Sequence, residues 1–174
     1  DIPLGLSMVG WMVIAGVSAP VYAYLAYRFQ LILLVHGAAI AAGVTLGTGL
    51  AALGAPLEWQ LSAVGMLAPV YVWSSVLLRQ HDREEMGLHL LVLAQAAVPA
   101  LFMTVLSLVL AEGASPATLT LGAWSLAALY ASSQRFYQHI AFEYLASAGV
   151  PVAAFITLAI HTPISLSWYN LMLV

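Results

Sequence analysis

Charged residues divide this chain into six long apolar runs, each free of Asp, Glu, Lys and Arg. Every run holds about 20 residues or more, the length that an α-helix needs to cross a bilayer. Strict alternation of apolar and polar residues is absent, so the pattern predicts helices and not membrane-spanning strands. The uncharged runs cover residues 2–27, 29–57, 59–78, 86–111, 113–134 and 144–174.

The pattern predicts an all-α, polytopic integral membrane protein with six transmembrane helices in a single domain, residues 1–174. The segments between the predicted helices are short, so we expect successive helices to be antiparallel neighbours. The predicted spans are residues 5–27, 31–53, 61–79, 87–111, 118–134 and 138–161.

A short pattern that occurs three times indicates an internal repeat. In each copy, an apolar stretch that contains a tyrosine ends in an arginine. Further along the chain comes a four-residue step, which consists of two small residues, then Val, and then Thr or Pro. Recurrence at a period of about fifty residues is typical of repeat architectures. The arginines are Arg28, Arg79 and Arg135, and the steps begin at Ala42, Ala96 and Ala148.

Each repeat holds two apolar segments and one arginine-bearing turn, which describes a helical hairpin. We therefore predict three tandem hairpins, at about residues 5–57, 61–116 and 118–164. The chain closes on the apolar stretch Leu171–Val174, where a polar tail is usual. This ending favours a fragment of a longer array or a processed chain, and the alternative is a short segment lying on the membrane surface.

Composition supports the membrane class. The chain is 63% apolar and 6% charged, with a mean hydropathy of +1.00, whereas about a quarter of the residues in soluble domains are charged. Cysteine is absent, which excludes disulfides and thiolate metal sites. Lysine is also absent and the net charge is −3, so there is no basic face for nucleic acid.

The arginines predict an orientation in the membrane. All of them lie in turns between an odd span and the following even span, whereas Glu58 and Glu112 lie in the opposite turns. Arginine in short loops marks the cytoplasmic side. We therefore expect the arginine-bearing turns to be cytoplasmic and both termini to lie on the opposite side, with a bacterial inner membrane as the location.

Prolines and small residues are expected to shape the helices. A proline inside a span frees a backbone carbonyl and bends the helix, and small residues let helices approach closely, as at Gly43 and Gly47. The internal prolines are Pro20, Pro69, Pro99 and Pro151.

Three histidines, His36, His89 and His139, recur near the start of each even span and should lie at similar depth. Imidazole can ligate haem or a chlorin, hydrogen-bond a quinone or relay protons. Two facing histidines are the minimum for a bis-histidine haem. The alternative is that each histidine bonds locally at the membrane interface. No cofactor is required by the sequence, and no metal site is predicted.

Arg135, His139 and Glu143 are spaced by one helical turn, so they are expected to share one helical face as a polar stripe. Glu143 is the one carboxylate that enters a predicted span, where a charge normally faces protein or water. The stripe is either a structural contact with a neighbouring helix or subunit, or an entry path for protons.

No paired intramembrane carboxylates, metalloprotease motif, nucleophile setting or phosphate loop is present, so we expect a protein that is not an enzyme. The first hypothesis is a non-catalytic accessory or scaffold subunit of a larger membrane complex, such as a respiratory or photosynthetic electron-transfer assembly. Its partners would be the lipid bilayer and other integral membrane subunits. The alternatives are a haem-, pigment- or quinone-binding electron-transfer subunit and a small-solute transporter.

Overall fold

The structure, a computed structural model, describes residues 7–161, and every regular element in this range is an α-helix. The all-α prediction is therefore confirmed for this part of the chain. Residues at both ends, including the apolar stretch 171–174, lie outside the described residues. The helices are α1 (Met8–Phe29), α2 (Ile32–Ala52), α3 (Leu57–Gly65), α4 (Ala68–Gln80), α5 (Glu84–Glu112), α6 (Ala117–Tyr137) and α7 (Ile140–His161).

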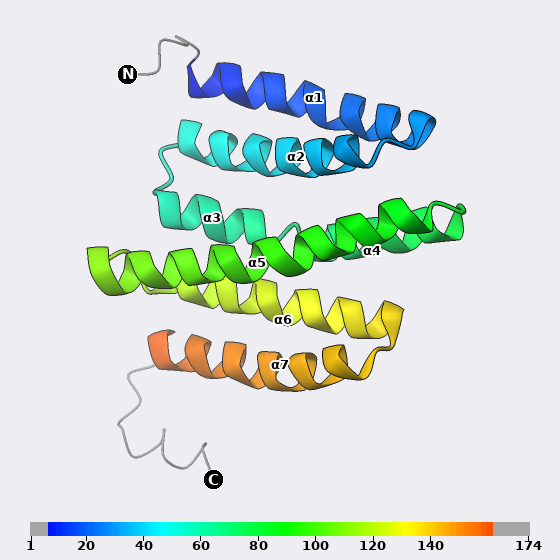
Figure 1. Cartoon of the computed structure of the whole chain (residues 1–174). Helices are drawn as coiled ribbons and strands as arrows, with labels where there is room; N and C mark the ends of the chain where they lie inside the picture. The colour runs from blue at the N-terminus through cyan, green and yellow to red at the C-terminus, as the bar shows by residue number, and fades with distance from the viewer. Residues whose placement is uncertain (1–6, 162–174) are drawn as a thin grey trace.

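The helices lie side by side with alternating directions, except that α3 and α4 follow one another in the same direction (Figure 1). Helices α1 and α2 form one antiparallel pair, α4 lies against α5, and α6 and α7 form a second pair at the other edge. Helix α5 also contacts α2, α3 and α6, so it joins the two outer pairs. This order fits the expected succession of hairpins, while the internal repeat itself stays a prediction.

The third predicted span, 61–79, is two helices. Helix α3 ends at Gly65 and α4 begins at Ala68, with Pro69 in the first turn of α4. Proline is accommodated in a first turn because its missing N–H would have no helical partner there. By contrast, α1, α5 and α7 continue through Pro20, Pro99 and Pro151. The sequence predicted bends at these four prolines inside the predicted spans, and of the four only Pro69 lies at a helix break.

Five segments in the described range are long and apolar enough to cross a membrane, with α3 and α4 counted as one segment. Helix α6 has 21 residues, as many as α2, but falls outside this set. Polar residues lower its mean hydropathy, and three of them, Thr118, Ser125 and Ser133, are buried inside the bundle. The number of membrane crossings therefore stays a prediction, with five candidate spans that agree with it and α6 as the sixth that the sequence predicted.

The centre of the bundle is a buried apolar cluster from α4, α5 and α6, which includes Val72, Leu91 and Leu129. Beside it, α4 and α5 approach closely: a Cβ atom placed on Gly87 would lie 2.5 Å from the backbone oxygen of Ser75. Only glycine allows this approach, so the packing of α4 on α5 depends on Gly87.

Side-chain hydrogen bonds connect the helices. In hydrocarbon a buried polar group must find a protein partner, because no water is available. The connections between helices include Tyr71 Oη to Ala39 O (2.8 Å), Ser75 Oγ with Tyr137 Oη (2.7 Å), Gln95 Nε2 to Ser133 Oγ (2.8 Å), Ser62 Oγ to Thr118 O (3.1 Å) and Trp124 Nε1 to Thr157 Oγ1 (3.0 Å).

All four arginines lie at one end of the bundle, on the right of Figure 1. Arg28, Arg79 and Arg135 are in the last turns of α1, α4 and α6, and Arg83 immediately precedes α5. We call this the arginine end. The segregation of arginine is thus confirmed, whereas the side of the membrane that it faces stays a prediction.

Candidate functional site

Two of the three predicted histidines meet. His36 lies near the start of α2 and His89 near the start of α5, and their ring centroids are 5.5 Å apart with the planes perpendicular. Both side chains are half-buried. The contact arises because a buried apolar cluster holds these two helix ends together; its members are Ala26, Val35, Ala39, Met86 and Leu90.

His139 is not part of this pair. It is exposed, in the short turn between α6 and α7. Its Nδ1 accepts a hydrogen bond from the backbone N–H of Ala141 at 3.2 Å, and its ring lies 6.0 Å from that of Phe142. His139 therefore bonds locally at the start of α7, which agrees with the alternative of local bonding. The repeat does not place it in a position equivalent to those of His36 and His89.

The geometry of the histidine pair does not fit a haem held between the two rings. Axial imidazoles of a bis-histidine haem approach the iron from opposite faces of the macrocycle, which must fit between them. His36 and His89 instead touch edge to face at a distance typical of direct aromatic contact. A single-histidine contact to a chlorin, or a hydrogen bond to a quinone, does not meet this obstacle.

The expected stripe of Arg135, His139 and Glu143 does not lie on one helix. Gln138 has a positive φ of 48° and ends α6, so Arg135 belongs to α6 and Glu143 to the first turn of α7. The prediction of a shared helical face was wrong because the three residues span a turn. Arg135 and Glu143 are exposed. Within residues 7–161 the one ion pair found joins Arg79 and Glu84, 3.2 Å apart.

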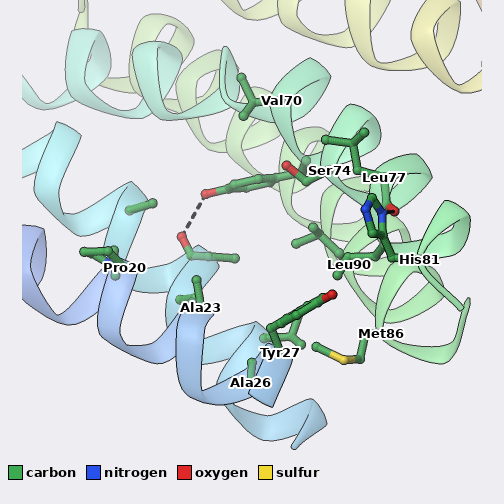
Figure 2. A pocket seen from close by; sticks show the side chains of 17 residues that line it. Pro20, Ala23, Ala26, Tyr27, Val70, Ser74, Leu77, His81, Met86 and Leu90 are labelled. Atoms are coloured by element: carbon green, nitrogen blue, oxygen red, sulfur yellow. Dashed lines mark hydrogen bonds between the residues drawn. The ribbon is translucent and has the colours of Figure 1, made fainter. Parts of the chain in front are cut away.

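An apolar groove is the feature that sequence reasoning missed. It has a volume of about 590 Å³ and lies between α1 and α2 on one side and α4 and α5 on the other (Figure 2). Small residues on α1 and α2 leave this space open, among them Ala23, Ala26, Ala38 and Ala42. Their spacing of three or four residues on each helix was a visible signal, but the sequence did not reveal which helix would face them.

The mouth of the groove lies at the arginine end. Tyr27 and His81 line it there, and Figure 2 shows the Tyr27 hydroxyl on the side of the groove where His81 lies. The guanidinium of Arg83 lies 5.6 Å from the centre of the Tyr27 ring, a distance typical of a cation–π contact. The Nε of Arg83 is buried and finds no hydrogen-bond partner among residues 7–161.

The polar groups in the groove wall are few. The Tyr71 hydroxyl donates its proton to the carbonyl of Ala39, drawn dashed in Figure 2, and Nδ1 of His81 bonds to the carbonyl of Leu77 at 2.8 Å. The groove can therefore receive a hydrocarbon along its length and a polar group at its mouth.

Comparison of the chain with protein-family models, curated proteins and solved structures found no match. The functional proposals below therefore depend on the fold, on the contact between His36 and His89, and on the apolar groove.

Proposed function

We propose that this chain is a non-catalytic accessory or scaffold subunit of a larger membrane assembly. The observation that carries the proposal is the set of hydrogen bonds between helices. Ser75, Gln95 and Ser62, polar side chains that could have lined a pathway, are instead bonded to neighbouring helices. An interior that uses its polar groups in this way is suited to holding a shape for partners to bind.

Charged side chains exposed at the arginine end support contacts outside the chain. Arg28, Arg135 and Glu143 are exposed, and none forms an ion pair within the described residues. Lipid headgroups and other integral membrane subunits are the partners that such groups meet at a membrane surface. With the arginine end cytoplasmic, as the positive-inside rule favours, these contacts form on the inner face of a bacterial inner membrane.

The assembly is tested by extracting the protein from its native membrane in a mild detergent and weighing the complex by native mass spectrometry. We expect one or more integral membrane subunits to remain bound in fixed stoichiometry. Recovery of a lone monomer, across several detergents that preserve other membrane complexes, would overturn the proposal.

Glu143→Gln should weaken this assembly. The exposed carboxylate has no partner within residues 7–161, so the substitution leaves the bundle intact and removes one charge from the arginine end. We expect a loss of about 1 kcal/mol or less in subunit affinity, as for exposed ion pairs, which titration in detergent would measure. Glu112→Gln, at the opposite end of the bundle, is the control and should leave the affinity unchanged. If the assembly stays intact but the activity of the whole complex is lost, Glu143 would instead be assigned to proton transfer.

A second candidate function rests on the contact between His36 and His89. Two half-buried imidazoles where α2 meets α5 could hydrogen-bond a quinone or ligate a chlorin through one ring. An absorption spectrum and a quinone assay of the purified protein test this function. Loss of the bound molecule in His36→Ala and His89→Ala, with retention in the His139→Ala control, would support it. Absence of both a pigment band and a quinone would remove it.

A further inference from the structure

We propose that the groove between α1, α2, α4 and α5 binds one acyl chain of a glycerophospholipid of the phosphatidylethanolamine type, with its phosphodiester at Arg83. This inference depends on the insertion of the helices in a membrane and not on the accessory role proposed above. The two proposals can therefore fail separately.

The interior of the groove has the chemistry of a hydrocarbon site. Its walls are alanines of α1 and α2 and larger apolar side chains of α4 and α5, such as Leu77 and Leu90. Water gains too few partners in such a space to remain there. Pro20, Ala23 and Val70 are exposed although they line the groove, so the groove is open along its side and a chain can enter from the bilayer.

The mouth of the groove has a cation suited to a phosphate. Arg79 is engaged by Glu84 at 3.2 Å, whereas half-exposed Arg83 forms no ion pair within the described residues. Its Nε is buried, so the two outer nitrogens of the guanidinium are the ones that a phosphate would meet. The planar guanidinium matches the geometry of phosphate oxygens. Stacking on Tyr27, which lines the groove, holds the Arg83 side chain beside the place where an acyl chain would emerge.

The acidic residues around Arg83 favour a headgroup that also carries a positive charge. Asp82 directly precedes Arg83, and Glu85 lies two residues after it in the first turn of α5. Both are exposed, and neither forms an ion pair within residues 7–161. A purely anionic headgroup would meet these carboxylates as well as the arginine. An ammonium group on the same lipid complements them, so the mixed charges of the turn match a zwitterionic headgroup.

The test uses the full chain, purified in detergent and incubated with equimolar phosphatidylethanolamine and phosphatidylglycerol of identical acyl chains. Native mass spectrometry then counts the lipids that each protein molecule retains. We expect preferential retention of phosphatidylethanolamine. Arg83→Gln should lower it about tenfold, equivalent to about 1.4 kcal/mol, because the substitution removes a charge-assisted hydrogen bond to the phosphate.

A second variant tests the groove separately from its mouth. Ala23→Phe places a ring at the groove wall and should also reduce retention about tenfold or more, because the acyl chain loses its space. The matched controls are Arg135→Gln, at the same end of the bundle but on α6, and Ala148→Phe, an exposed position on α7. Exposed Arg135 can meet the headgroup of either lipid, so the quantity compared is the preference for phosphatidylethanolamine over phosphatidylglycerol. Neither control should change this preference, and all four variants should elute as monodisperse protein.

Four results would overturn the proposal. An equal preference for phosphatidylethanolamine in Arg83→Gln and Arg135→Gln would show that Arg83 does not hold the headgroup. Equal retention in Ala23→Phe and Ala148→Phe would show that the groove does not hold the chain. Preferential binding of phosphatidylglycerol, or recovery of a prenylquinone in the groove, would assign the site to a different ligand.

Discussion

Replacement of Gly87 by alanine is expected to destabilise the helix bundle by about 3 kcal/mol, the upper part of the range for an overpacked interior. The added Cβ atom would lie 2.5 Å from the backbone oxygen of Ser75. A backbone oxygen cannot rotate away as the end of a side chain can, so α4 and α5 must move apart. Their separation would also disturb Ser75 Oγ, which bonds to the Tyr137 hydroxyl at 2.7 Å.

Gly47→Ala is the matched control for this substitution. Gly47 is also in a helix, but its added Cβ atom would lie 3.8 Å from the nearest atom, a side-chain carbon of Val64. This is ordinary van der Waals contact, so we expect no loss of stability. Thermal unfolding in detergent, followed by size-exclusion chromatography of the surviving protein, compares the two variants. Equal midpoints for both would show that α4 and α5 do not pack as described.

Leu129→Ala should destabilise the bundle by about 2–5 kcal/mol, the range for large-to-small changes at buried leucines. Leu129 is 0% exposed and packs where α4, α5 and α6 meet. In a bilayer the lipid is as apolar as leucine, so this loss reports lost packing contacts and not transfer from water.

Leu110→Ala separates packing from leucine chemistry. Leu110, on α5, is 77% exposed and would contact lipid in both the folded and the dissociated helices. We expect a change within about 0.5 kcal/mol, as for substitutions away from buried features. Titration with a denaturing detergent measures both variants against the unaltered chain. A loss at Leu110 as large as that at Leu129 would place a protein contact on the outer face of α5.

Features that depend on one segment at a time could be predicted from the sequence. Long uncharged runs require helices in hydrocarbon, and the positions of Arg28, Arg79 and Arg135 mark helix ends at one side of the bundle. The helices observed agree with the predicted spans within a few residues, except where α3 and α4 divide a span. The hydrophobicity of a segment indicates whether it enters the bilayer, but it does not indicate whether the segment forms one continuous helix or two.

Features that depend on how helices face one another could not be predicted. His36 and His89 meet because α2 packs on α5, whereas His139, at the equivalent place in the third repeat, lies in a turn. The helical rotation that decides these contacts is set by packing across many residues. The stripe from Arg135 to Glu143 was wrong for a different reason, since spacing by four implies a shared face only inside an unbroken helix.

The burial of polar residues in α6 has a consequence for biogenesis. A segment with buried Thr118, Ser125 and Ser133 and relatively low hydropathy partitions into lipid less readily on its own than its neighbours do. Its polar side chains are satisfied by other helices, as in the bond from Gln95 on α5 to Ser133. We therefore expect α6 to wait at the insertion machinery until α5 is in the bilayer, and to enter together with α7. The order in which the helices are synthesised would then be part of what makes this fold attainable.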